Sequence, residues 1–335
     1  MDNYIVSWFF SEDKNDESYY PQVGGKTSSN NFKNIYWKCI LDFYYSSIIN
    51  NNCKHMFFTN VDEIPEILDG INIKKFFYDN NIEIVNLNLT NKTPKNWFNA
   101  WRNQFYIFDI LNYISLNLNK DDNVIILDSD CLIMKDLNNI FKTIKEYKCI
   151  AYDIKYPNDY NVNGITREDM KEIYNSIYKE KASNINYYGG EFIGVTVQTA
   201  TLILEEYRNL WDKNYDLYKN GKKKLNEEAH FLSLIYTKLG LNNNKANKFI
   251  KRMWTSSKFS NLNENDKKLY IWHLPAEKKT GFIYFYKYIH LDRINKESLF
   301  EISSKLMGVP KKSISKKAKD LISKISYRIV NKNVF

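Results

Sequence analysis

Apolar residues recur along the first half of the chain with two alternating spacings, one typical of strands and one typical of helices. Buried strands are predicted for the short apolar runs at 4–10, 55–58, 82–87, 124–127 and 149–154. Between these runs, apolar residues every three to five positions predict helices over 32–49, 99–118 and 137–147. Because strands that alternate with helices usually form parallel sheets, we expect an α/β fold with a mostly parallel sheet flanked by helices.

The second half of the chain has a more mixed pattern. Helices are predicted over about 167–181 and 197–219, and a shorter helix is expected to begin near Glu227 after an Asn226 N-cap. Shorter extended segments are predicted at 187–195, 248–255 and 270–273.

Two acidic side chains follow the strand predicted at 124–127. Asp128 and Asp130 are two residues apart, so on an extended chain both side chains point the same way. Such a pair can also belong to a turn that caps a helix, but here apolar residues resume at Cys131. Two like charges beside a core are costly unless a cation lies between them, and oxygen ligands suit Mg²⁺ or Mn²⁺. The pair therefore predicts a metal-dependent enzyme that acts on a diphosphate.

The composition allows a large hydrophobic core and does not alter the predicted fold class. The chain has 335 residues, of which 44% are hydrophobic and 16% aromatic, and no stretch approaches the roughly 20 apolar residues of a membrane span. The first residues lack the pattern of a secretory signal. The four cysteines have no zinc-site spacing, so we expect reduced thiols and a cytoplasmic protein.

Most of the net charge of +9 lies at the C-terminal end. From Lys311 onward there are eight basic residues and one acid, Asp320. Because the charge is concentrated there and no binding motif accompanies it, we expect no nucleic-acid partner. Helical spacing is shown by Ile314, Ala318, Leu321, Ile322, Ile325 and Ile329. This basic amphipathic tail, 311–335, is predicted either to bind an anionic membrane surface through 311–332 or to dock on the body with its basic face solvated.

With these residues, the chain resembles nucleotide-sugar glycosyltransferases of the GT-A fold over roughly residues 3–285. Asp128-Ser129-Asp130 is similar to the Asp-x-Asp motif that, in this family, holds the metal on the diphosphate of the donor. The segments 187–195 and 226–231 resemble paired motifs of retaining blood-group-type galactosyl- and N-acetylgalactosaminyltransferases. The resemblance implies that Glu228 is the acid proposed as nucleophile or cation stabiliser. It also implies that Glu227 and His230 are neighbours that bind donor or acceptor.

A third segment is similar to glycogenin-like retaining transferases. The run 271–275 with downstream lysines resembles a region in which a histidine completes the metal shell and a lysine contacts the leaving diphosphate. The resemblance implies that His273 is a metal ligand with Asp128 and Asp130, and that Lys278 or Lys279 binds the donor. A histidine beside Trp272 can also be a packed side chain without a ligand role.

Other donor-binding candidates have weaker patterns. Arg102, near a helix start, could reach a phosphate with its forked donors or could remain on a solvated helix flank. Gly189 and Gly190 could allow a close approach of backbone to a ligand. Ser7 and Trp8 in the first strand complete the predicted donor site. The acids Glu227 and Glu228 also suit the first turn of a helix for dipole reasons alone.

Together these features predict a GT-A catalytic domain over 1–310, with a nucleotide-sugar half at about 1–155 and an acceptor half at about 156–310. The expected reaction is transfer from a nucleotide-diphosphate sugar, expected to be UDP-linked, to a glycan or lipid-linked acceptor with retention of configuration. An inverting enzyme with Glu191 or Glu228 as base stays open, as does a non-catalytic carbohydrate-binding relative. A sugar-nucleotide pyrophosphorylase would need a glycine-rich loop after the first strand, and none follows Trp8. If the tail binds lipid, the protein would be peripheral on the inner face of the membrane.

Overall fold

A six-stranded sheet forms the centre of the molecule in the computed structural model, which describes residues 1–335 except 19, 21, 25, 257–258 and 323–335. Its strand order is β5-β2-β1-β6-β9-β8, and only β9 runs antiparallel to its neighbours. The strands are β1 (Asn3–Phe9), β2 (Lys54–Thr59), β5 (Ile82–Asn86), β6 (Asn123–Leu127), β8 (Cys149–Asp153) and β9 (Tyr188–Thr196). The expected α/β class, with a mostly parallel sheet flanked by helices, is confirmed.

Alternate residues of each strand enter two different cores, as the two-residue period of a strand requires. In β6, Val124 and Ile126 pack with helices on one face, whereas Ile125 and Leu127 pack with helices on the other. The first face is covered by α3 (Tyr106–Asn117), α5 (Arg167–Tyr178), α6 (Val197–Lys219) and α7 (Glu228–Lys238). The second is covered by α1 (Asn30–Asn50), α2 (Ile73–Asp79) and α4 (Asn138–Tyr147).

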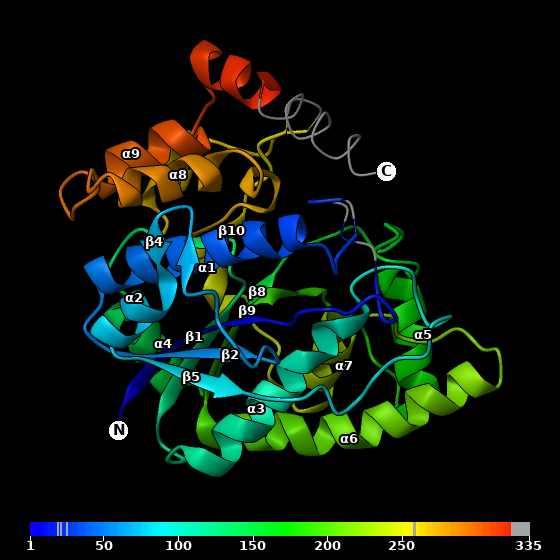
Figure 1. The fold of residues 1–335 in the computed structure, drawn as a ribbon. Coiled ribbons are helices and arrows are strands. Elements are labelled where there is room, and N and C mark those ends of the chain that lie inside the picture. The colour runs from blue at the N-terminus through cyan, green and yellow to red at the C-terminus, as the bar shows by residue number, and fades with distance from the viewer. Residues whose placement is uncertain (19, 21, 25, 257–258, 323–335) are drawn as a thin grey trace.

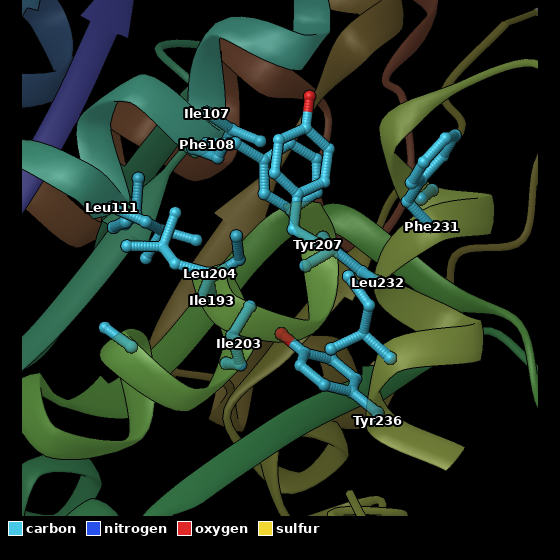
Figure 2. Packing of buried hydrophobic residues seen from close by; sticks show 14 of the residues in the cluster. Ile107, Phe108, Leu111, Ile193, Ile203, Leu204, Tyr207, Phe231, Leu232 and Tyr236 are labelled. Atoms are coloured by element: carbon cyan, nitrogen blue, oxygen red, sulfur yellow. The ribbon is translucent and has the colours of Figure 1, made fainter. Parts of the chain in front are cut away.

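The core on the first face is rich in aromatic rings. Figure 2 shows Phe108 of α3 and Tyr207 of α6 lying face to face, and their ring centroids are 3.6 Å apart. Phe231 of α7 packs against the same rings. Because such rings bury large apolar surfaces, they fix α7, and hence the acids at its start, against the sheet.

A second, smaller sheet continues from β6. It contains β7 (Cys131–Ile133), β11 (Ile271–His273) and β10 (Ile250–Arg252) in the order β10-β11-β7. His273 pairs with Cys131 in the antiparallel register of β11 and β7. The chain therefore passes from the main sheet to the small sheet through residues 128–130, and the small sheet carries a histidine to that crossing point.

A helical layer covers the outer side of α1 and the small sheet. It consists of α8 (Gly281–His290), α9 (Leu299–Met307) and a last helix over 314–322, which lies outermost in Figure 1. The minor elements are the hairpin of β3 (Ile67–Leu68) and β4 (Ile71–Asn72) and four 3₁₀ turns at Arg102–Phe105, Lys245–Lys248, Glu264–Lys268 and Pro275–Glu277. Among the described residues, no helix is both long and apolar enough to cross a bilayer.

Several predicted boundaries are wrong, each for a local reason. The helix predicted from residue 99 begins later, because Trp101 has a left-handed backbone with φ of 50° and a 3₁₀ turn intervenes before α3. The strand predicted at 248–255 is limited to β10. Asn226 does not cap α7, since its Oδ1 accepts a hydrogen bond from Lys224 Nζ, and Glu227 occupies the N-cap position. In the tail, Ile325 and Ile329 lie outside the described residues.

Candidate active site

Two aspartates lie where β6 ends and β7 begins. The Asp128 amide donates to the Glu191 carbonyl at 3.3 Å, and the Asp130 carbonyl accepts from the Leu274 amide at 2.9 Å. These backbone bonds join the crossing segment to β9 and to the end of β11. Asp130 is buried, whereas Asp128 is half-buried. The predicted pair therefore lies at a junction of both sheets, held by backbone that cannot easily shift.

His273 completes this cluster. Its Nε2 lies 3.3 Å from Asp130 Oδ1 and 3.8 Å from Asp128 Oδ2. One ligand atom from each of the three residues can be chosen so that all lie within 4.8 Å of one another. Two carboxylate oxygens and one imidazole nitrogen form a donor set that suits Mn²⁺ or Mg²⁺. The predicted ligands are thus brought together, and their chemistry fits the predicted cation.

The orientation of His273 is set by a third carboxylate. Glu191 Oε1 lies 3.3 Å from His273 Nδ1, and Arg252 holds both oxygens of Glu191 through Nε at 2.7 Å and Nη2 at 2.5 Å. Burial would raise the pKa of Glu191, but Arg252 and His273 overcome it and lower that pKa to about 2. Glu191 is therefore a fixed anion. A histidine whose Nδ1 faces such an anion presents Nε2 to a metal, an arrangement common at metal centres.

The two predicted lysines have different positions. Lys278 Nζ pairs with Asp130 Oδ2, and it lies 5.5 Å from the centre of the Tyr36 ring. Burial disfavours its charge, but Asp130 more than compensates and raises the pKa of Lys278. Lys279 Nζ instead donates to the Val23 carbonyl at 2.7 Å. Of the two, it is Lys278 that places a permanent positive charge at the acidic cluster.

A cavity of about 340 Å³ opens beside this cluster. Asp128, Asp130, His273 and Lys278 contribute to its lining, and so do Glu227, Glu228 and Gly190. Aromatic rings supply much of the rest: Trp8, Phe9, Phe10, Tyr20, Phe32, Tyr36, Trp101, Tyr156, Tyr160, Tyr187 and Trp254. A cleft with mostly apolar walls and a few convergent polar groups is the usual form of a small-molecule site.

Glu228 at the start of α7 is buried in this cavity. A Cβ on Gly190 would overlap the Glu228 carboxylate, so a larger residue at this position would force that carboxylate to move. Gly189 stands in the same relation to Glu191. Because these two glycines lack side chains, the carboxylates of Glu228 and Glu191 can pack against them. Gly190 also lines the cavity. With its amide nitrogen turned toward Glu228, Gln104 donates to both oxygens at 2.9 and 2.8 Å. Burial, then Glu227 and Asp128, raise the pKa of Glu228 well above its usual value.

Glu227 and His230 form a supporting network. Glu227 Oε1 accepts from the Tyr187 hydroxyl at 2.6 Å, and Oε2 accepts from Asn163. His230 Nδ1 accepts from the Asn226 amide at 3.2 Å, which leaves the proton on Nε2, 3.3 Å from Glu227 Oε1. Burial lowers the pKa of His230, so the ring stays neutral. Glu227 reaches the cavity, whereas His230 lies behind it.

Two other predicted donor-binding residues hold the framework. The Ser7 hydroxyl donates to the Leu127 carbonyl at 3.0 Å and so joins β1 to β6. Arg102 Nη2 donates to the carbonyls of Asp16 and Glu17 at 3.0 and 2.9 Å, which fastens the loop after β1. Among the described residues that line the cavity, Trp8 is present but neither Ser7 nor Arg102 is.

Four residues that line the cavity are absent from the predicted site residues. Arg252 orients Glu191, Gln104 contacts Glu228 and Tyr187 holds Glu227. Glu12 is buried in the loop after β1, where it accepts from Ser18, from Thr27 at 2.5 Å and from Asn103 at 2.5 Å. Only Tyr187 carried a sequence signal, because it lies in the segment singled out at 187–195. The other three come from segments without a motif.

Comparison with known proteins gives distant similarities. The sequence matches no protein-family model and no curated protein. The structure is similar to the galactosyltransferase LgtC, solved in complex with donor and acceptor sugar analogs, with a TM-score of 0.42 and 12% identity over 70% of each chain. It is also similar to mouse xyloside xylosyltransferase 1 in its apo form, with a TM-score of 0.46 and 8% identity over 82% of this chain and 97% of that chain. At this distance, a function has to be argued from the geometry of the cavity.

Proposed function

We propose that this protein is a GT-A type glycosyltransferase that depends on Mn²⁺ or Mg²⁺ and uses a nucleotide-diphosphate sugar as donor. The observation that carries the proposal is the arrangement of one cavity. One wall bears Asp128, Asp130, His273 and Lys278, which suit a metal-bound diphosphate, and Glu228 is close enough to Asp128 for the two charges to interact. A sugar nucleotide bound between these groups would have its diphosphate beside the metal-binding wall and the anomeric carbon of its sugar beside Glu228. We expect a UDP-linked donor.

The leaving group would be stabilised mainly by charge. A divalent cation held by Asp128, Asp130 and His273 would supply Lewis-acid stabilisation of the departing diphosphate. Lys278 would add positive charge where negative charge develops, since its ammonium group already lies at Asp130. Glu191 and Arg252 would keep His273 in place, and Tyr36 would limit the movement of Lys278.

Glu228 would act at the anomeric carbon. Its raised pKa means that the ionised form is unfavourable before a sugar binds. Binding of the donor with its cation would lower that pKa, so that Glu228 passes its proton to water, and the carboxylate would bond to the anomeric carbon as the bond to the diphosphate breaks. The acceptor hydroxyl would then displace Glu228 and pass its proton to the diphosphate, and these two displacements give retention of configuration. Of the two candidate bases for an inverting reaction, Glu191 and Glu228, Glu191 is engaged with Arg252 and His273, and its lowered pKa makes it a poor base.

The acceptor would lie in an adjoining groove of about 840 Å³. This groove shares Tyr156, Tyr160, Arg252 and Trp254 with the cavity. The rings of Tyr156 and Tyr160 are stacked, with centroids 4.8 Å apart, and Tyr160 is 52% exposed. Exposed aromatic faces suit the apolar faces of sugar rings, so a glycan, free or lipid-linked, is the proposed acceptor. On this proposal, the donor side is shared between the two halves, since Asp128 and Asp130 come from residues 1–155 whereas His273 and Lys278 come from residues 156–310. Residues 156–310 also supply Glu228 and the acceptor side.

The test combines donor binding with product analysis. UDP-, GDP-, CMP- and dTDP-sugars are each added with Mn²⁺ or with EDTA, and the melting temperature is followed, because a bound ligand stabilises the native state. We expect stabilisation by UDP-sugars with metal only, and slow hydrolysis that first releases the sugar with the anomeric configuration of the donor, read by NMR. Metal-independent stabilisation, or no stabilisation by any donor, would contradict the proposal. Inverted product would contradict the assigned role of Glu228.

The acceptor groove is tested separately. Labelled oligosaccharides of galactose, glucose and N-acetylglucosamine are offered as acceptors, and the best one is used with Tyr160→Ala. We expect KM for that acceptor to rise by about fivefold, as for the loss of one ring contact, with donor hydrolysis unchanged. An unchanged KM would remove the groove from the proposal.

A further inference from the structure

The last described helix, over 314–322, attaches to the body by its polar side. Lys316 and Asp320 are buried, although they are the residue types least often found inside a protein. They face Glu277, which is wholly buried at the short turn before α8. Residues four apart lie on one face of a helix, so this buried face is defined by charge.

Ion pairs among four charged side chains attach this helix to the body of the protein. Lys316 Nζ lies 2.7 Å from Glu277 and 2.5 Å from Asp320. Lys312 Nζ, just before the helix, lies 2.6 Å from Glu277 and 2.5 Å from Asp320. Two cations therefore meet two anions, and Thr280 donates a further hydrogen bond to Glu277 at 2.6 Å. Pairs this buried hold a geometry firmly, because leaving any one partner alone would be costly.

The opposite face of the helix is apolar and exposed. Ile314 is 87% exposed, Leu321 is 61% exposed and Ile322 is 62% exposed. The helix thus reverses the usual order, with charges inward and aliphatic side chains outward. A docked tail with a solvated basic face is found only in part among the described residues, because Lys317 and Lys319 are exposed whereas Lys316 is buried.

Exposed charges beside this apolar face indicate which kind of surface it can bind. Lys311 and Lys317 are exposed beside it, and so is Lys319. The acid of this helix, Asp320, is neutralised in the buried cluster. An aliphatic strip bordered by lysines is complementary to a bilayer with anionic lipids, which offers acyl chains beneath negative headgroups.

We propose that the exposed face of the helix over 314–322 is a membrane contact that binds anionic bilayers while its polar face stays locked to Glu277. The ion pairs make the contact rigid, so membrane binding would fix the orientation of the whole protein rather than tether it loosely. Glu277 directly precedes Lys278, and the helix is therefore anchored beside the segment that lines the cavity. This contact does not depend on glycosyl transfer, and it goes beyond the function proposed above.

Vesicle flotation of the full-length protein without any donor tests the proposal. Vesicles of phosphatidylcholine alone are compared with vesicles that also contain phosphatidylglycerol. The key variant replaces both exposed side chains, Leu321→Asn and Ile322→Asn. Its matched control carries Leu116→Asn and Leu202→Asn, which replace exposed apolar residues (75% and 47%) on α3 and α6.

We expect the wild type and the control to float with anionic vesicles only. The key variant should bind these vesicles more weakly, by about tenfold or more, because two apolar side chains are lost from the contact. Binding of the key variant equal to wild type would overturn the proposal. So would equal binding of the wild type to both kinds of vesicle. If the wild type binds neither vesicle but self-associates in sedimentation, and the variant does not, the face pairs with a second copy of the chain and the proposal is wrong.

Discussion

Two buried groups of charges differ in how they are balanced. At the C-terminal side, Glu277 and Asp320 meet Lys312 and Lys316, so acids and bases are equal in number. In the cavity the permanent cations among the described lining residues are Arg252 and Lys278, with His273 beside them. The acids of that lining are Glu12, Asp128, Asp130, Glu191, Glu227 and Glu228.

The difference separates a structural cluster from a functional one. A balanced cluster needs nothing further, and its role is to hold two segments together. An excess of buried acid is costly unless a cation or a developing positive charge joins it. The raised pKa of Glu228 and the crowding of Asp128 with Asp130 are signs of that excess. On the proposed function, the cations that offset this excess of acid are a metal ion and a sugar that becomes cationic in the transition state.

The largest expected effect comes from Asp130→Asn, which removes a proposed metal ligand and the partner of Lys278. We expect turnover to fall by about 10³-fold or more, because the stabilisation of the leaving group is lost. The binding of Mn²⁺, followed by electron paramagnetic resonance, should weaken in parallel, while circular dichroism stays unchanged. The matched control is Asp121→Asn, an exposed acid just before β6, which should behave as wild type. Normal turnover of Asp130→Asn would contradict the assigned metal site.

Glu228→Gln should separate activity from stability. Glutamine has nearly the shape of glutamate, and the substitution removes one acid from the cavity, where acids outnumber cations. We therefore expect turnover to drop about 10²-fold or more while Tm stays equal or rises. Differential scanning fluorimetry and a donor-hydrolysis assay give both quantities. A marked fall in Tm would show that the Glu228 carboxylate is structural, and the comparison of the two clusters would fail.

Glu277→Gln should have the opposite effect on stability. It leaves the buried Lys316 and the half-buried Lys312 with one acid, so we expect a loss of roughly 3 kcal/mol in the free energy of unfolding. Urea denaturation measures this loss, and Glu301→Gln, an exposed acid on α9, is the control and should change stability little. If Glu277→Gln is as stable as wild type, the ion pairs do not hold the C-terminal helix.

The smallest expected effect concerns a buried cation outside both clusters. Lys224 donates to the Trp97 carbonyl and to Asn226 Oδ1 and lies 3.9 Å from the centre of a Trp97 ring. Burial lowers the pKa of Lys224 to about 7. Above pH 7 the unfolded chain therefore binds a proton that the folded chain has released, and stability gains with rising pH. Compared with Lys224→Met, the wild type should gain on the order of 1 kcal/mol between pH 7 and pH 9, a figure reduced for solvent screening. Parallel melting curves of the two proteins at both pH values measure this gain, and no relative change would contradict it.

Much of the main sheet was predictable, because local patterns dominate there. The apolar runs of β1, β2, β5, β6 and β8 are short and well separated, and their order in the chain indicates the α/β class. The helix over 197–219 was predicted within its observed bounds, since its apolar spacing is regular. The boundary at Trp101 was not predictable, because a left-handed residue other than glycine leaves no sequence pattern.

The sequence by itself determined the Asp128–Asp130 pair and its position after a core strand, because a two-residue spacing in an extended chain depends on local geometry alone. Only the tertiary structure decided that Glu191 and Arg252 orient His273, since Glu191 lies on β9 of the main sheet, whereas Arg252 and His273 lie on β10 and β11 of the small sheet. The same holds for the reversed tail helix. Its amphipathic pattern is local, but which face turns inward depended on a buried carboxylate at Glu277, more than thirty residues earlier. Long-range electrostatic contacts overruled the ordinary preference of apolar side chains for the interior.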